Sequence, residues 1–187
     1  MFGDAYDGLD ADRPKYGNVN FLDHVRGDAR AAQYGSSYMV LRKHVRDRCT
    51  ITSKDSCYAD GQLGTLQYCA HVLLHKVQMC NERTRGGLIK VLYYLGTPTH
   101  PHALQELNNG ADALRKSKLE YMELQVHGLV QFDEDVVEVS VAEERLIRGD
   151  TPLDLCAEEQ LILWRRFATR FGVPAFRVSA NAKVPLS

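Results

Sequence analysis

The sequence predicts an α+β domain, in which a small mixed or antiparallel sheet of short strands packs against two or three helices. Three observations support this class. Several short segments alternate apolar and polar residues, as strands with one buried face do. Two longer segments repeat apolar residues every three or four positions, as amphipathic helices do. Because these two kinds of segment do not alternate strictly along the chain, a parallel βαβ architecture is not expected.

Length and composition indicate one globular domain over residues 1–187. The chain is 44% hydrophobic and 25% charged, which is ordinary for a folded protein. Residues 1–15 are rich in Gly, Asp and Pro, so we expect an irregular N-terminal arm there.

Charge and hydropathy narrow the function classes. Lys and Arg number 23 against 24 for Asp and Glu, so no basic excess points to nucleic acid or to an anionic membrane. No apolar run is long enough to span a bilayer, and the N-terminus lacks a signal peptide. The five cysteines are odd in number and form no C-x-x-C pair, which favours reduced thiols over disulfides or a zinc site. We therefore expect a cytoplasmic protein with no nucleic-acid or membrane partner.

The first third of the chain predicts three short strands, over residues 16–21, 37–41 and 49–53. The last of these runs into SKDS at 53–56, whose side chains favour turns and helix caps. Between the second and third strands lie Arg42, Lys43, Arg46 and Arg48. We interpret this basic cluster as a solvated face.

The middle of the chain predicts helices. The clearest apolar stripe consists of Leu63, Leu66, Ala70, Leu73 and Val77. Residues 87–96 are bounded by glycines and fit a buried helix or a buried strand equally well. Residues 97–102 contain two prolines and must form a loop, and residues 103–110 predict a short helix.

The last third predicts strands at 120–128, 136–141 and 175–179. Between the last two, Thr151-Pro152 has the pattern of a helix N-cap. A helix with the apolar stripe Leu161, Trp164, Ala168 and Phe171 should follow and end near Gly172, with Trp164 buried.

The strand EYMELQVHG at 120–128 carries the strongest functional signal. Side chains alternate faces along a strand, so Met122, Leu124 and Val126 should point one way. The opposite face then presents a row of groups that can hydrogen-bond: Tyr121, Glu123, Gln125 and His127. The pattern alone leaves two interpretations open, a solvated outer surface or the floor of a site.

Other candidate motifs are weaker. His71 and His75 have a spacing that can bind zinc, but Val72 stands where a metalloprotease would need its Glu, so a structural pair is favoured. His100 and His102 flank a proline in a loop. Phosphate loops, dinucleotide fingerprints and nucleophile elbows are absent from the sequence. No metal site is predicted.

Several segments together resemble a known family. They are FGDAYDG at 2–8, RPKYGNVN at 13–20, YGSSYMVLR at 34–42, RCTITSKDS at 48–56, YMELQVHG at 121–128 and FGVPAFRV at 171–178. Their order resembles a mostly bacterial family of uncharacterised proteins, domain of unknown function 3626. Typical members carry a further segment before FGDAYDG, with an arginine and a serine-rich turn. The resemblance therefore leaves open a truncated or inactive member.

A looser similarity connects the chain with ADP-ribosyltransferases, which place a catalytic Glu on a late strand. That similarity implies that Glu123 stabilises the ribosyl cation formed from NAD, with Gln125 orienting a protein or small-molecule acceptor and His127 beside them. It further implies that Arg13 holds the pyrophosphate and that Ser36, Ser37 or Ser53 supports the nicotinamide side. The order here, Glu then Gln, differs from the arginine-modifying class, and the early His-Gly motif of the poly-type enzymes is not evident.

Two alternatives remain open. One is a metal-assisted hydrolase that uses Glu123 and His127 with a loop histidine. The other is a binding or interaction module that keeps the fold without chemistry.

Overall fold

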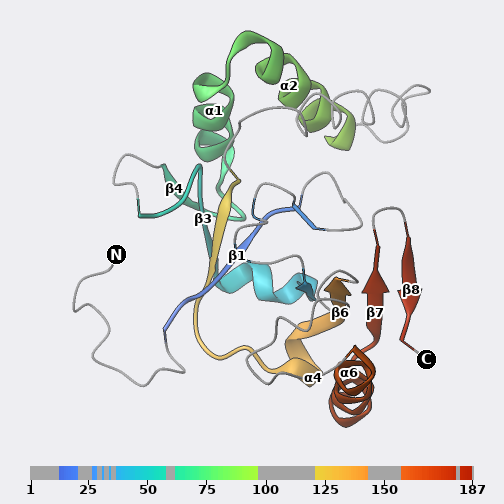
Figure 1. Cartoon of the computed structure of the whole chain (residues 1–187). Coiled ribbons are helices and arrows are strands. Elements are labelled where there is room, and N and C mark those ends of the chain that lie inside the picture. Colours follow the sequence, from blue (N-terminus) through green and yellow to red (C-terminus); the bar gives the residue numbers. More distant parts are fainter. Residues whose placement is uncertain are drawn as a thin grey trace.

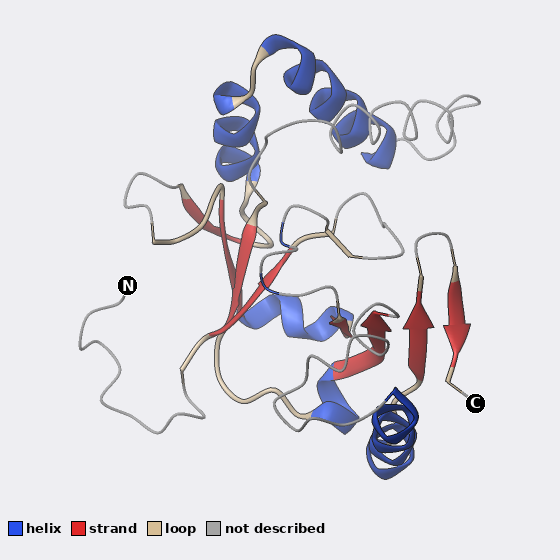
Figure 2. Ribbon diagram, in the orientation of Figure 1, coloured by secondary structure: helices blue, strands red, loops and turns tan. Residues whose placement is uncertain are grey.

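Two small sheets form the framework of the protein in a computed structural model, which describes residues 13–20, 27–28, 31, 34, 37–57, 62–96, 121–142, 157–179 and 182–186 (Figure 1). Each sheet has four strands. Helices lie at both ends of the molecule, and another helix lies between the two sheets (Figure 2). The predicted α+β class is confirmed, with two sheets in place of one. The predicted helix at 103–110, the cap at Thr151-Pro152 and most of the N-terminal arm lie outside the described residues.

The first sheet has the order β1-β5-β3-β4 and is antiparallel throughout. Its strands are β1 (Lys15–Asn18), β5 (Glu123–Val126), β3 (Cys49–Thr52) and β4 (Leu63–Thr65). Strands β3 and β5 fall within predicted strands, and β1 overlaps the strand predicted at 16–21. Because β5 is an interior strand, its backbone is paired on both sides, and its side chains are placed by both neighbours.

Helix α1 (Ala70–Met79) covers the apolar face of this sheet. Val72 is fully buried and packs with Ile51 of β3 and Met122, which directly precedes β5. Helix α2 (Glu82–Gly96) then packs on α1 through a cluster that includes Cys80 and Leu88. The ambiguous segment 87–96 is thus helical.

The predicted helical stripe is wrong at its beginning. Leu63 lies in β4, paired with β3, and Leu66 lies in the turn before α1. The reason is tertiary: the backbone of residues 63–65 completes the edge of the sheet, while Leu66 still reaches the core beside Val126. Leu63 and Leu66 are three positions apart, as on one face of a helix, but one lies in a strand and the other in a turn.

The second sheet has the order β2-β6-β7-β8. Its strands are β2 (Tyr38–Leu41), β6 (Val136–Ala142), β7 (Ala175–Val178) and β8 (Lys183–Pro185), the last of which was not predicted. Strands β6 and β7 are parallel, and helix α6 (Ala157–Phe171) lies between them in sequence, as a parallel pair requires a long crossover. Phe167 and Phe171 of α6 pack against a buried cluster to which β6 contributes Val136, Val139 and Val141.

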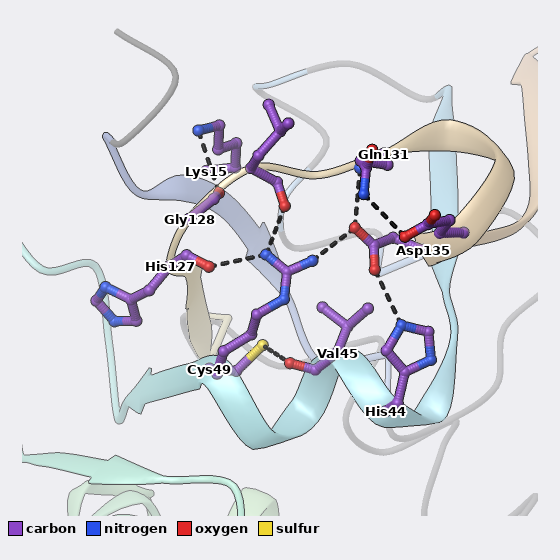
Figure 3. A network of polar contacts seen from close by, with 11 residues as sticks. Lys15, His44, Val45, Cys49, His127, Gly128, Gln131 and Asp135 are labelled. Atoms are coloured by element: carbon purple, nitrogen blue, oxygen red, sulfur yellow. Dashed lines mark hydrogen bonds and ion pairs between the residues drawn. The ribbon is translucent and has the colours of Figure 1, made fainter. Parts of the chain in front are cut away.

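A polar junction links the two sheets. It involves the 3-10 helix η3 (Lys43–Arg48), which leads into β3, and α4 (Phe132–Asp135), which leads into β6. Arg48 donates hydrogen bonds to the backbone carbonyls of His127 and Leu129, at 2.8 and 2.7 Å, and forms an ion pair with Asp135 at 2.6 Å (Figure 3). One guanidinium therefore holds the end of β5 and the start of β6 together.

The loop after β5 has a second set of restraints. Gly128 has a φ of +77°, a left-handed conformation that favours glycine, and its carbonyl accepts a hydrogen bond from Lys15 Nζ at 3.3 Å. Asp135 is itself saturated, because its oxygens also accept from the backbone N–H of Gln131 at 2.8 Å and contact His44 Nε2 at 2.9 Å (Figure 3). The prediction that the basic cluster is only a solvated face is wrong for Arg48, because its side chain is only 31% exposed and lies between two structural elements.

No helix within the described segments is both long and apolar enough to cross a membrane.

The junction predicts a pH-dependent stability. Burial opposes ionisation of Asp135, but hydrogen bonds from Gln131 and His44 and the charge of Arg48 outweigh it and lower the pKa of Asp135. Its stabilising contribution is therefore present above the unfolded-state pKa of about 3.9 and is lost as the pH falls toward the folded-state value. Asp135→Asn should lower the free energy of unfolding by roughly 3 kcal/mol at pH 7, because it leaves Arg48 without its charge partner.

Urea unfolding between pH 3 and pH 7 measures this effect. The difference between wild type and Asp135→Asn should be largest at pH 7 and should shrink below about pH 4. Asp133→Asn, an exposed neighbour on α4, is the matched control and should differ little from wild type. A constant difference across this pH range would contradict the assigned pKa direction.

The aromatic contacts of α6 generate a second stability prediction. Trp164 is half-buried and not fully buried as expected, and it meets Phe167 edge-on with ring centroids 5.7 Å apart. Trp164→Ala should cost about 3 kcal/mol, because the lost indole leaves a cavity beside the β6 core. The adjacent Leu163 is 44% exposed, so Leu163→Ala should cost less than about 1 kcal/mol in the same denaturation experiment. Equal losses for the two variants would count against this packing.

Candidate functional site

The polar row of β5 lies in the interior of the protein. Tyr121 is 5% exposed, Glu123 is 4% exposed and Gln125 is 1% exposed, while His127 is half-buried. A solvated outer surface would leave such side chains in water. That interpretation of the row is therefore excluded.

The opposite face of the same strand is the apolar core. Met122 and Val126 are 1% and 2% exposed, and half-buried Leu124 packs between the clusters that contain them. This part of the alternation is confirmed. Both faces of β5 are thus shielded from water, although only one is apolar.

The neighbouring strands add their own polar groups to the face of Glu123. Residues directly opposite one another in an antiparallel pair share a face. Asn18 of β1 and Thr52 of β3 both lie opposite Glu123, and Tyr16 and Thr50 both lie opposite Gln125. The row on β5 is therefore the centre of a polar floor built by three strands.

Hydrogen bonds connect the floor along its length. Gln125 Nε2 donates to Glu123 Oε1, and Gln125 Oε1 accepts from the Thr50 hydroxyl at 2.8 Å. The same hydroxyl lies 2.9 Å from Nε2 of His127. The carboxylate is thus held from one side by a chain of three side chains.

The other side of the Glu123 carboxylate is available. Its second oxygen, Oε2, accepts no hydrogen bond from the described residues, and it keeps some access to solvent, because Ser140 Oγ is the only fully buried side-chain atom without a partner among those residues. This oxygen is consequently the atom of the floor best suited to a cationic ligand or transition state.

A tyrosine–carboxylate cluster closes one end of the floor. Asp55, three residues after β3, accepts hydrogen bonds at Oδ2 from the hydroxyls of Tyr34 and Tyr121, both at 2.9 Å. The two hydroxyls are also 2.9 Å apart, and the rings meet edge-on at 5.7 Å. At its other oxygen Asp55 accepts from the backbone N–H of Cys57 at 2.9 Å.

The contacts of this cluster shift the pKa values of Asp55 and Tyr121 in opposite directions. The backbone N–H and thiol of Cys57, and then the hydroxyls of Tyr121 and Tyr34, lower the pKa of Asp55 to about 2. Burial, together with the hydrogen bonds to Tyr34 and Asp55, raises the pKa of Tyr121. Asp55 is therefore an ionised acceptor, and Tyr121 a neutral donor, throughout the ordinary pH range.

A buried lysine from α1 connects this end of the floor to the helix behind it. Lys76 is 1% exposed, and its ammonium donates to the carbonyl of Ser53 and, at 3.3 Å, to the carbonyl of Tyr121. The end of β3 and the residue two positions before β5 are thus bridged by one cation. His75, one residue earlier, places its Nδ1 2.8 Å from Ser53 Oγ.

The residues assigned to NAD binding are dispersed. Ser53 is fully buried at the end of β3, and its hydroxyl contacts His75 and the backbone N–H of Gln62. Ser37 precedes β2 in the second sheet, where its hydroxyl accepts from the backbone N–H of Ala142 at 3.1 Å. Arg13 is exposed, two residues before β1. Ser36 lies outside the described residues.

The structure brings together Glu123, Gln125 and His127, and adds residues that sequence reasoning missed. Strand register and helix packing bring three further residues to the floor: Thr50, Asp55 and Lys76. Their partners on or next to β5 lie 45 to 75 positions away in the sequence. One signal was available for Lys76, a charged residue one helical turn after the buried Val72. Thr50 and Asp55 had no signal beyond their place in a strand and a turn.

The two histidines of α1 have structural partners. His71 Nε2 lies 2.8 Å from the carbonyl of Leu63, and His75 contacts Ser53 as described. Over the described residues, no group of three or more His, Cys, Asp or Glu side chains could hold a metal ion. His100 and His102 lie outside these residues.

Comparison with known proteins identifies a family for most of the chain. The family described as "Protein of unknown function (DUF3626)" matches residues 1–161. A search of curated proteins found no match.

The carboxylates at the end of the floor predict the reactivity of Cys57. This exposed thiol has its pKa raised by its hydrogen bond to Asp55, by slight desolvation, and by the negative charges of Asp55 and Glu123. Since the thiolate is the reactive form, alkylation by iodoacetamide at pH 8 should be slow for so exposed a cysteine. Asp55→Asn should accelerate it roughly three- to tenfold, measured at the Cys57 peptide by mass spectrometry.

Glu123→Gln should accelerate the same reaction by a smaller factor, because only its charge acts on Cys57. Glu158→Gln, an exposed position on α6, is the charge-matched control and should leave the rate unchanged. An unaltered rate in Asp55→Asn would show that these carboxylates do not control the thiol.

Proposed function

The chain belongs to the DUF3626 family of proteins of unknown function, and we propose that it is an ADP-ribosyltransferase-like enzyme that uses NAD as its substrate. One observation carries this proposal. On an interior strand, Glu123 is only 4% exposed as a whole residue, and one oxygen of its carboxylate is held by Gln125 while the other has no partner among the described residues.

The chemistry of NAD cleavage suits such a carboxylate. The bond between C1′ of the ribose and the ring nitrogen of nicotinamide breaks, and its electron pair leaves with nicotinamide, which becomes neutral. Positive charge develops on the ribosyl carbon. A fixed anion in a sheltered place stabilises that charge more effectively than water does, because it needs no reorganisation as the reaction proceeds. The acceptor then bonds to C1′ through an oxygen or nitrogen and releases its proton.

Glu123 is the proposed catalytic residue. Its Oε2 would face the ribosyl carbon and the neighbouring ribose hydroxyl, while Oε1 stays bonded to Gln125. A carboxylate held at one oxygen keeps its rotamer, so the free oxygen is aimed without a further loss of side-chain entropy.

The other assigned residues receive unequal support. Both polar atoms of the Gln125 amide are engaged within the protein, which favours holding Glu123 over orienting an acceptor. The hydroxyls of Ser53 and Ser37 are likewise bonded to protein groups. Exposed Arg13, at the entrance to β1, remains the candidate for the pyrophosphate. The acceptor class, a protein or a small molecule, stays an open part of the proposal.

The proposal is tested by turnover of NAD with the purified chain. Free nicotinamide and transfer of labelled ADP-ribose are measured with wild type and Glu123→Gln. The variant keeps the shape of the side chain and removes its charge, so turnover should fall about 100-fold or more, with the melting temperature little changed. The matched control Glu158→Gln should retain full turnover.

Two outcomes would overturn the proposal. One is wild-type chain that neither cleaves NAD nor is stabilised by it in a thermal-shift measurement. The other is turnover in Glu123→Gln equal to that of wild type. Loss of activity on addition of a chelator would instead support the metal-assisted hydrolase.

A further inference from the structure

The hydrogen bonds that join Glu123 to His127 have a defined direction. An ionised carboxylate can only accept hydrogen bonds, so the amide nitrogen of Gln125 must face Glu123 Oε1. The amide oxygen of Gln125 then faces Thr50 and can only accept. The Thr50 hydroxyl is consequently the donor of that 2.8 Å contact.

The direction of these hydrogen bonds decides which ring nitrogen of His127 carries a proton. A threonine hydroxyl has one proton, and Thr50 uses it toward Gln125. The remaining 2.9 Å contact, between Thr50 Oγ1 and His127 Nε2, is a hydrogen bond only if Nε2 carries a proton. His127 must therefore be the Nε2–H tautomer, or the doubly protonated ring, whenever Glu123 is ionised.

We propose that Thr50 and His127 are positioning residues for Glu123, acting through the Gln125 amide. Gln125 is 1% exposed, so its amide orientation depends on the two groups that it contacts. Rotation of the amide by half a turn would place its oxygen against the carboxylate, two acceptors facing each other. Thr50 blocks that rotation by donating to the oxygen, and His127 supplies the proton that leaves Thr50 free to donate.

The location of these residues supports the assignment. Thr50 lies directly opposite Gln125 in the pairing of β3 with β5, so the hydroxyl is delivered by strand register. His127 is held at the other end of the chain by backbone contacts, its N–H to the carbonyl of Arg48 at 3.0 Å and its carbonyl to the Arg48 guanidinium at 2.8 Å. In Figure 3 the carbonyl of His127 points toward that guanidinium, while its imidazole points away from the junction.

The first test needs no substrate. Long-range ¹H–¹⁵N NMR of the full chain at neutral pH reports which ring nitrogen of His127 carries the proton. The expected result is a protonated Nε2. A protonated Nδ1 with a bare Nε2 would overturn the proposal, because the chain would then run in the opposite direction, from a protonated Glu123 toward His127.

Thr50 variants sharpen this measurement. Thr50→Val keeps the side-chain shape and removes the hydroxyl that accepts from Nε2, so the ¹⁵N shift of His127 Nε2 should change as this hydrogen bond is lost. Thr50→Ser restores the hydroxyl and should restore the wild-type shift. Thr169→Val, which removes a hydroxyl that donates to a carbonyl within α6, is the matched control and should leave His127 as in wild type. An unchanged Nε2 shift in folded Thr50→Val would overturn the proposal, and if that variant does not fold, the wild-type tautomer still decides it.

The second test rests on the proposed NAD-cleaving function. Misplacing Glu123 should lower kcat roughly 10- to 100-fold in Thr50→Val while KM for NAD stays near the wild-type value, and Thr50→Ser should recover most of kcat. Unchanged kcat in Thr50→Val would overturn the positioning role. If wild type shows no turnover, the proposed function fails, and the tautomer alone then decides whether the directed chain exists.

Discussion

The ion pair between Arg48 and Asp135 is the interaction on which the described structure depends most. One guanidinium binds two backbone carbonyls after β5 and one carboxylate just before β6, so it joins an element of the first sheet to an element of the second. Burial of a carboxylate is costly unless hydrogen bonds or an ion pair compensate it, and Asp135 is also bonded to Gln131 and His44. Loss of either partner would remove the ion pair at the place where the chain passes from one sheet to the other.

The position of the candidate site follows from that junction. The carbonyl of His127 is one of the groups that Arg48 binds, and Gly128 turns the chain with a left-handed φ immediately afterwards. His127 is thereby fixed at the end of the polar floor, next to Thr50. The junction and the hydrogen-bond chain to Glu123 thus share His127. Its backbone is bonded to Arg48, and its side chain contacts Thr50.

Burial on both faces of β5 explains why the floor is organised as a chain. In the interior, each polar group needs a partner, and a side chain such as Gln125 satisfies this by accepting at one end and donating at the other. The chain ends on Glu123, whose remaining oxygen has no partner among the described residues. Burial and the hydrogen bond from Gln125 together fix the orientation of the Glu123 carboxylate in a sheltered place, and the proposed function requires this property.

Alternation along residues 121–127 was sufficient to predict that Tyr121, Glu123, Gln125 and His127 share one face with an apolar core behind them, because strand geometry is local. The α+β class and most strands could be predicted for the same reason. Only the tertiary structure decided that this face is buried, that Thr50 and Asp55 belong to it, and that Arg48 connects the two sheets through its hydrogen bonds and ion pair. Leu63 shows the limit of local patterns, because its spacing predicted a helix although the residue lies in strand β4. Cross-strand register and the packing of helices on sheets bring together residues far apart in sequence, and no local period encodes those pairings.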